Sequence, residues 1–112
     1  MTVSALDDAS RSRGRERALE ARRRRAEIKR DLRSARRGVA EVLSLREEDP
    51  VVGRMRVVDF IEALPGIGPV RAGEVMAECA ISPSRRLRGL GEHQARALTR
   101  ALAPRMRRTA RS

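Results

Sequence analysis

Two glycine-rich loops bracket one short amphipathic segment, and they restrict how this chain can fold. The first loop spans residues 64–68 (LPGIG) and the second spans residues 85–91 (RRLRGLG). Each loop ends where a helix can begin, so each offers backbone N–H groups and the positive end of a helix dipole. Such helix starts bind anions. The pattern predicts helices joined by two tight turns, with a surface suited to the backbone of a polyanion such as nucleic acid.

The composition favours an all-α chain with a small aliphatic core. Hydrophobic residues make up 40% of the 112 residues, with one Phe and neither Trp nor Tyr. Ala, Leu, Arg, Glu and Met are frequent, whereas β-branched residues are few and scattered, as is typical of helical proteins. The length predicts a single domain.

The net charge of +11 is distributed in blocks. Residues 1–20 are balanced, residues 21–46 and 65–112 each carry a net charge of +7, and residues 47–64 carry −3. Clustered positive charge is typical of nucleic-acid-binding proteins. The predominance of arginine, with Lys29 as the only lysine, is also explained by a GC-rich genome, but codon usage does not explain the clustering.

The first half of the chain predicts a tail followed by a long helix. Residues 1–14 are polar and predict a disordered tail. From Arg15 onward apolar residues recur at helical spacing and form one seam, which comprises Ala21, Ile28, Leu32, Ala35, Val39 and Val42. Arg37 and Gly38 predict a helix end, with a second short helix following up to about Arg46. We therefore expect one helical domain over residues 15–103, with the long and short helices within 15–46.

The second half predicts a compact helical module over residues 56–103. Residues 47–50 read as a turn, and the segment 51–64 fits either a strand or a helix, of which we favour a helix over about 56–64. Pro69 suits the first position of the next helix, and Ser82 with Pro83 predicts a single turn that carries Arg85 and Arg86. A last helix begins near Glu92 and is predicted to stop at Pro104, which leaves residues 104–112 as a basic tail.

The candidate binding residues fall in three groups. The first loop offers Gly66, Ile67, Gly68, Val70 and Arg71, in which backbone N–H groups would hold a phosphate and Arg71 would pair with it. A purely structural helix–helix turn explains this loop equally well. The second loop offers Arg85, Arg86, Arg88, Gly89 and Gly91, where guanidinium groups match phosphate geometry or enter a narrow minor groove. The third group is a basic stripe on the long helix, made of Arg22, Arg25, Lys29, Arg33 and Arg36.

The chain carries little that points to catalysis, a cofactor or a metal. Cys79 is the only cysteine and His93 the only histidine, so we expect neither a disulfide nor a Cys/His metal site. No catalytic triad, Walker loop or dinucleotide fingerprint is present, and a Schiff-base lyase acting through Lys29 lacks a partner carboxylate. We expect a non-enzymatic protein without cofactors, located in the cytoplasm and not in a membrane.

The second loop and its surroundings resemble a known family. Residues 64–72 (LPGIGPVRA) together with residues 81–94 (ISPSRRLRGLGEHQ) are similar to the actinobacterial integration host factors. This resemblance implies a long N-terminal helix packed on a helix-two-turns-helix module, and a nucleoid protein that binds double-stranded DNA with little sequence preference. It also implies DNA compaction and support of phage integrase complexes through the DNA. We expect such a protein to be a monomer, and its DNA-binding arginines correspond to Arg85, Arg86 and Arg88.

Two departures from the family pattern and two rival functions remain. Pro69 replaces the basic residue often found after the second glycine, and the first twenty residues match nothing that we can place. A ribosomal or other RNA-binding protein with the same module is the main alternative, since phosphate contacts alone do not separate DNA from RNA duplexes. A protein–protein adaptor that binds an acidic partner is the other.

Overall fold

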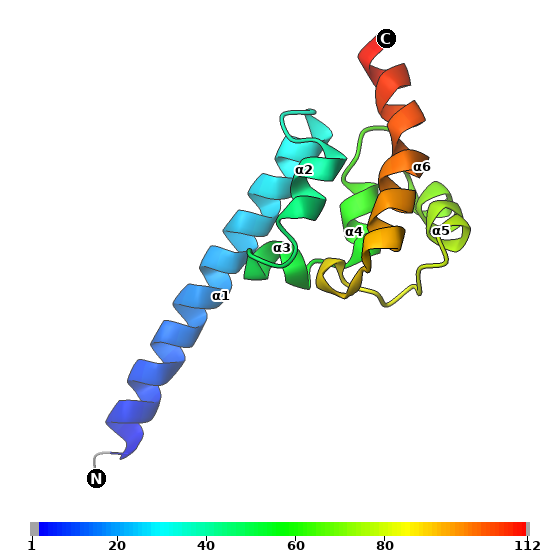
Figure 1. The fold of residues 1–112 in the computed structure, drawn as a ribbon. Helices are drawn as coiled ribbons and strands as arrows, with labels where there is room; N and C mark the ends of the chain where they lie inside the picture. The colour runs from blue at the N-terminus through cyan, green and yellow to red at the C-terminus, as the bar shows by residue number, and fades with distance from the viewer. Residues whose placement is uncertain (1–2, 112) are drawn as a thin grey trace.

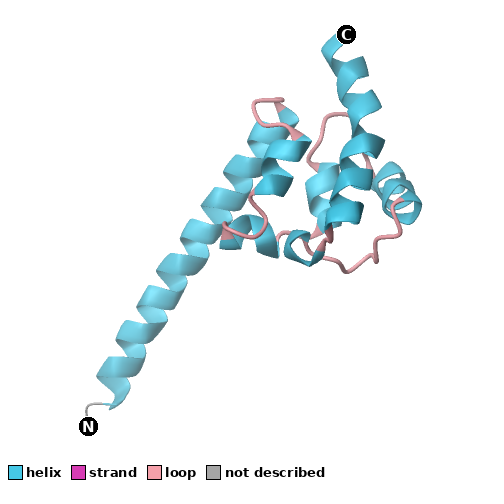
Figure 2. Ribbon diagram, in the orientation of Figure 1, coloured by secondary structure: helices cyan, strands magenta, loops and turns pink. Residues whose placement is uncertain are grey.

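The computed structural model, in which the backbone of residues 3–111 and the side chains of residues 8–103 are described, is a helical body beyond which the N-terminal part of the first helix and the C-terminal turns of the last helix extend (Figure 1). The helices are α1 (Val3–Arg33), α2 (Val39–Ser44), α3 (Pro50–Arg54), α4 (Val57–Glu62), α5 (Pro69–Glu78) and α6 (Glu92–Arg111), with the 3-10 turn η1 at Leu87–Gly89. The described residues form no strand, which confirms the predicted all-α class (Figure 2). The molecule measures 62 × 28 × 25 Å because the N-terminal half of α1 extends beyond the body.

The helix α1 differs from its prediction at both ends. It already includes residues 3–14, which the sequence predicts to be disordered, because a single glycine inside a helix costs only about 1 kcal/mol and Gly14 does not interrupt the helix. It ends at Arg33 and not at Arg37, since Ala35 takes a left-handed conformation with φ 61°. Arg37 then donates to the carboxylate of Asp31 at 2.8 Å, which turns the chain back towards the body. Ala35 is consequently exposed and is not part of the apolar seam.

The C-terminal helix also differs from its prediction. Its backbone continues through Pro104 to Arg111, where the sequence predicts a stop and a tail. A proline inside a helix removes one backbone hydrogen bond and kinks the helix more readily than it ends it. The side chains of residues 104–112 lie outside the described set.

The segment 47–56 contains a helix that the sequence analysis missed. Asp49 caps α3, because its carboxylate accepts hydrogen bonds from the N–H groups of Val51 and Val52. Pro50 occupies the first helical position, where its missing N–H costs nothing. The valines that suggested a strand are thus held in two short helices, α3 and α4, joined at Met55 and Arg56.

The core is aliphatic and continuous, as predicted. Phe60, the only aromatic residue, is fully buried, as are Ile28 and Leu32 from α1. Leu87 from the second loop and Leu98 from α6 are also fully buried, so the loop is anchored in the same core. The longest helix and the two-turn module therefore form one packed unit, in which burial of apolar surface is the main stabilising term.

A buried arginine joins the two halves of the chain. Arg46 donates to the carbonyls of Leu43 (2.8 Å) and Leu90 (3.4 Å) and to the carboxylate of Glu92 (3.1 Å). These bonds link the end of α2 to the start of α6 and satisfy a charge that would otherwise be costly to bury. None of the described helices is both long and apolar enough to cross a membrane.

Candidate nucleic-acid interface

The second loop is held against the joint between α3 and α4. Arg86 forms an isolated antiparallel bridge with Arg56, in which the N–H of Leu87 donates to the carbonyl of Met55 at 2.9 Å. The N–H of Val57 donates to the carbonyl of Arg85 at 3.0 Å. The guanidinium of Arg86 adds a bond to the carbonyl of Arg54 at 3.0 Å. Two segments thirty residues apart in the sequence therefore form one short ribbon of backbone.

This ribbon gathers exposed arginines that have no acidic partner. We call it the arginine ribbon, and its members are Arg54, Arg56, Arg85, Arg86 and Arg88. Within residues 8–103, none of the five forms an ion pair, whereas Arg24, Arg37, Arg46 and Arg71 each do. Unpaired guanidinium groups close together repel one another, so the ribbon favours a phosphate chain that neutralises them.

The sequence analysis missed Arg54 and Arg56. They lie in the segment 47–64, whose net charge of −3 gives no sign of a basic surface. Their proximity to the second loop depends on the antiparallel bridge, for which the local sequence gives no signal. The backbone is extended at Met55 and Arg56, so side chains two residues apart point to the same side of the chain. Arg54 and Arg56 have this spacing, which is the local signal that both face the same surface.

Glycine at position 53 allows the ribbon to pack closely on α3. A Cβ atom there would lie 2.6 Å from the carbonyl oxygen of Arg46 and 3.2 Å from the Cβ of Arg88. The buried Arg46 and the exposed Arg88 therefore lie on either side of position 53, which has no room for a side chain.

The predicted single turn at Ser82 and Pro83 is displaced. Residues 83–84 form a plain turn, and the helical turn lies at Leu87–Gly89 instead. The buried Leu87 explains the shift, because its side chain must reach the core while its neighbours Arg86 and Arg88 face solvent. The side chain of Arg85 lies over Gly89, and its guanidinium donates to the carbonyl of Gly89 at 3.3 Å. A Cβ atom at position 89 would lie 2.9 Å from Cδ of Arg85, so glycine allows this close contact.

The first loop lies at the opposite end of α4. The helix starts beside the second loop, through the bond from Val57 to Arg85, and its last residues lead into residues 64–68 (Figure 1). Its six residues separate the two loops by about 9 Å at a rise of about 1.5 Å per residue. The two loops therefore cannot hold the same phosphate group.

The backbone of the first loop has the predicted form. Gly66 takes a left-handed conformation with φ 75°, and Gly68 is the N-cap of α5 with Pro69 directly after it. Ile67 is buried, while the side chain of Val70 is 78% exposed. The proposed anion contacts of Gly66, Ile67, Gly68 and Val70 stay a prediction.

Arg71 is engaged on its own helix. Its guanidinium donates to Glu74 at 3.1 Å and to Glu78 at 3.3 Å. The hydrogen bond to Glu74, together with the charge of Glu78, raises the pKa of Arg71. The side chain that was expected to pair with a phosphate at the first loop is thus already neutralised by two carboxylates.

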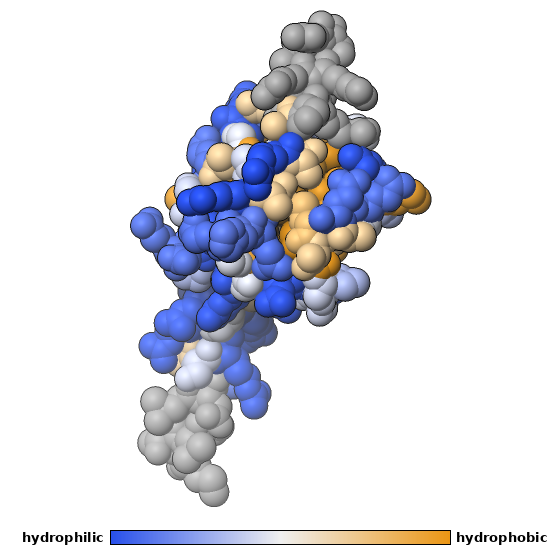
Figure 3. Space-filling model, turned by 45° about the vertical axis from the view of Figure 1, so that its right-hand side comes forward, coloured by the Kyte–Doolittle hydropathy of each residue, from blue (hydrophilic) through white to orange (hydrophobic). Residues whose placement is uncertain are grey.

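The basic stripe lies mostly along α1. Arg22, Arg25, Lys29 and Arg33 belong to this helix, whereas Arg36 lies beyond its end, in the turn. Arg25 and Lys29 are half-buried and the other three are exposed, and none of the five forms an ion pair with a residue of the described set. Figure 3 shows hydrophilic side chains along α1 and a mixed apolar and polar surface over α5 and α6.

The remaining reactive groups have structural positions. Burial raises the pKa of the Cys79 thiol, which keeps it protonated as a small core residue. His93 is exposed in the first turn of α6, as predicted. Across residues 8–103, no three His, Cys, Asp or Glu side chains gather in a group that could hold a metal ion.

Known proteins are similar to this chain in sequence and in fold. Residues 32–102 match the family described as the S13-like H2TH domain. The chain is 45% identical over 98 residues to the integration host factor of Mycobacterium tuberculosis, covering 88% of this chain and 93% of that protein. It is 41% identical over 100 residues to the integration host factor of Streptomyces coelicolor, covering 89% and 94%. Its fold is similar to the structure of sIHF bound to an 8-bp palindromic DNA, with a TM-score of 0.75, 44% identity, and coverage of 77% of this chain and 97% of that one.

Proposed function

The chain belongs to the actinobacterial integration host factor family with its S13-like H2TH domain, and we propose that it binds double-stranded DNA through the arginine ribbon. The prediction of a non-enzymatic protein agrees with this family. The related sIHF has been solved with DNA bound, which supports the same ligand here.

One observation carries the proposal: five exposed arginines, contributed by two distant segments, lie together without an acidic partner in residues 8–103. Arginine forms bidentate, charge-assisted bonds with phosphate oxygens, so such a ribbon grips the backbone of a duplex. Phosphate contacts fix the position of a protein on DNA but do not read its sequence. The binding is therefore largely independent of sequence, with guanidinium groups that enter the minor groove where it is narrow.

The basic stripe on α1 extends this surface along the duplex. Arg22 and Arg33 are exposed on the same helix, which gives the bound DNA a second line of positive charge. In this proposal the protein acts as a monomer in the nucleoid, where it changes the topology and compaction of DNA and supports site-specific recombination through the DNA alone.

A fluorescence titration with matched duplexes of DNA and RNA tests the proposal. Neutralising about five phosphates gives a slope near −4 to −5 in a plot of log K against log salt concentration. The double variant Arg85→Ala/Arg86→Ala should weaken DNA binding by about tenfold, with the circular dichroism spectrum unchanged because both side chains are exposed. The variant Arg71→Ala removes an arginine that is already paired and serves as the matched control, with a change below about twofold.

Two outcomes would contradict the proposal. Equal affinity of the folded double variant and the natural chain would remove the arginine ribbon from the interface. Tighter binding of duplex RNA than of duplex DNA would favour an RNA-binding protein. The lack of Trp and Tyr argues against recognition by base stacking on those side chains, but not against binding of an RNA duplex.

A further inference from the structure

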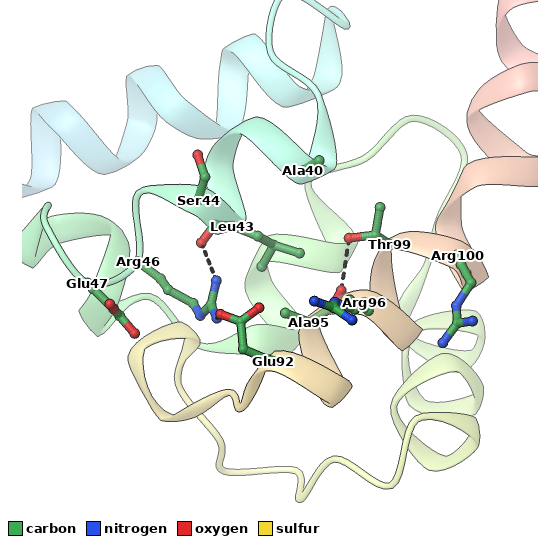
Figure 4. A pocket seen from close by; sticks show the side chains of 10 residues that line it. All are labelled: Ala40, Leu43, Ser44, Arg46, Glu47, Glu92, Ala95, Arg96, Thr99 and Arg100. Carbon is green, nitrogen blue, oxygen red and sulfur yellow. Dashed lines mark hydrogen bonds and ion pairs between the residues drawn. The ribbon is translucent and has the colours of Figure 1, made fainter.

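A hollow outside the arginine ribbon lies between α2 and α6. It has a volume of about 640 Å³ (Figure 4). Ala40, Leu43 and Ser44 line it from α2, and Ala95, Arg96, Thr99 and Arg100 line it from α6. Arg46, Glu47 and Glu92 complete one end. We call this hollow the α2–α6 groove.

We propose that the α2–α6 groove docks an acidic amphipathic helix of a partner protein. The residues that carry this inference lie outside the arginine ribbon, the basic stripe and the first loop, so it does not depend on the proposed DNA contacts.

Most polar groups of the groove are already used. The hydroxyl of Ser44 donates to the carbonyl of Glu41 at 2.6 Å, and that of Thr99 donates to the carbonyl of Ala95 at 2.8 Å. Arg46 is bonded to two carbonyls and to Glu92. A small polar ligand needs several directed partners, which these groups no longer supply.

The charges that remain free are spaced for a helix. Arg96 and Arg100 stand four residues apart on α6, both exposed and neither in an ion pair within residues 8–103. Carboxylates four residues apart on a second helix have the same spacing along its axis. The distance from Glu92 to Arg100 along α6 is about 12 Å, which corresponds to about two turns of such a helix.

The floor of the groove favours protein over DNA. Leu43 and Ala95 are buried apolar residues, and Ala40 is small, so a third helix can approach closely and bury its own apolar side chains there. The phosphates and sugars of a DNA backbone carry no apolar side chain that could fill this floor. The carboxylate of Glu47 at one end, which forms no ion pair within residues 8–103, repels phosphates but attracts a basic residue of the partner, which gives the contact a direction.

The test uses the full chain and a synthetic peptide as probe. The peptide has sixteen residues, with leucines along one face and glutamates spaced four residues apart beside it, and a control peptide carries lysine in place of glutamate. Fluorescence anisotropy at 150 mM salt should show binding of the acidic peptide only. The variant Arg85→Ala/Arg86→Ala should bind the acidic peptide as the natural chain does, which would show that these two arginines of the arginine ribbon do not hold the peptide.

Two variants of exposed residues decide whether the groove is the site. Arg96→Glu/Arg100→Glu should weaken peptide binding at least tenfold and change DNA binding by less than about threefold. Ala40→Glu leaves both arginines in place but puts a carboxylate on the α2 wall, and it should also weaken peptide binding at least tenfold.

Three results would overturn the inference. Peptide binding that survives both variants places the contact elsewhere. Loss in the arginine variant without loss in Ala40→Glu reduces the contact to charge on α6 alone. A DNA affinity that falls in Arg96→Glu/Arg100→Glu as far as in Arg85→Ala/Arg86→Ala assigns the groove to the DNA-binding surface.

Discussion

The loop at residues 64–68 and the loop at residues 85–91 each contain two glycines and two buried aliphatic residues, with arginine beside the first loop and within the second, and they differ in how these charges are paired. Arg71 beside the first loop is bonded to Glu74 and Glu78 on its own helix. The arginines of the second loop have no acidic partner in residues 8–103. A loop motif that offers N–H groups is therefore only half of an anion site, and the charge left free around it decides the rest.

The two loops also differ in what holds them in place. The first loop is formed by neighbours in the sequence, with Gly66 in a left-handed conformation and Gly68 capping α5. The second loop depends on distant contacts, because Leu87 is bonded to Met55 and Arg86 to Arg54. Local geometry suffices for the first loop, while the second requires the packing of α3 and the buried Arg46.

A pair of glycine-to-alanine variants tests this dependence and carries the largest expected effect. Gly53→Ala would bring a methyl group to 2.6 Å from the carbonyl of Arg46, so it should lower the free energy of unfolding by about 1–3 kcal/mol. Gly73→Ala lies inside α5, where an added Cβ meets nothing within 4 Å, and should raise it by about 0.5–1 kcal/mol. Urea denaturation followed by circular dichroism measures both values.

The sign of the difference is the informative part of this experiment. A neutral Gly53→Ala would mean that the second loop tolerates a shift of α3, and the distinction between local and distant support would fail. Binding of DNA by the folded fraction of Gly53→Ala should also be weaker, since the added methyl group displaces Arg88, whose Cβ lies 3.2 Å from it.

Charge reversal at single positions compares the two loops directly. Arg56→Glu should weaken binding to a duplex of about 20 base pairs by five- to tenfold, because it places a carboxylate in the arginine ribbon next to Arg86. Arg71→Glu makes the same change of charge beside the first loop and should weaken binding by less than about twofold. Anisotropy titrations at 100 mM salt measure both affinities, and equal losses would show that the overall charge matters more than the position.

The sequence predicted the elements whose determinants are local. Pro69 at the start of α5 and the buried seam residues Ile28, Leu32 and Val42 are confirmed, since proline and apolar spacing act within a few residues. It missed α3, because Val51 and Val52 read as a strand and only the cap formed by Asp49 decides for a helix. It also placed the end of α1 too late, because Ala35 takes a left-handed conformation, for which alanine gives no signal in the sequence.

The candidate site was predictable where the arginines are neighbours and not where they meet through the fold. Arg85, Arg86 and Arg88 stand together in the sequence, whereas Arg54 and Arg56 join them only through the bridge between residues 56 and 86. The pairing of Arg71 with Glu74 and Glu78, by contrast, is predictable from spacings of three and seven residues, which place all three side chains on one face of α5.

The smallest expected effect comes from making the first loop resemble the second. Glu74→Gln/Glu78→Gln removes the carboxylates that hold Arg71 and leaves its guanidinium free beside the N–H groups at the start of α5. DNA affinity should rise by about two- to threefold at 100 mM salt, and the salt slope should steepen by about one as a further phosphate is neutralised. The same substitutions in an Arg71→Ala background serve as the control and should leave the slope unchanged. A rise in affinity of equal size in that background would show that removing negative charge suffices, and that the first loop does not contact the DNA even when its arginine is free.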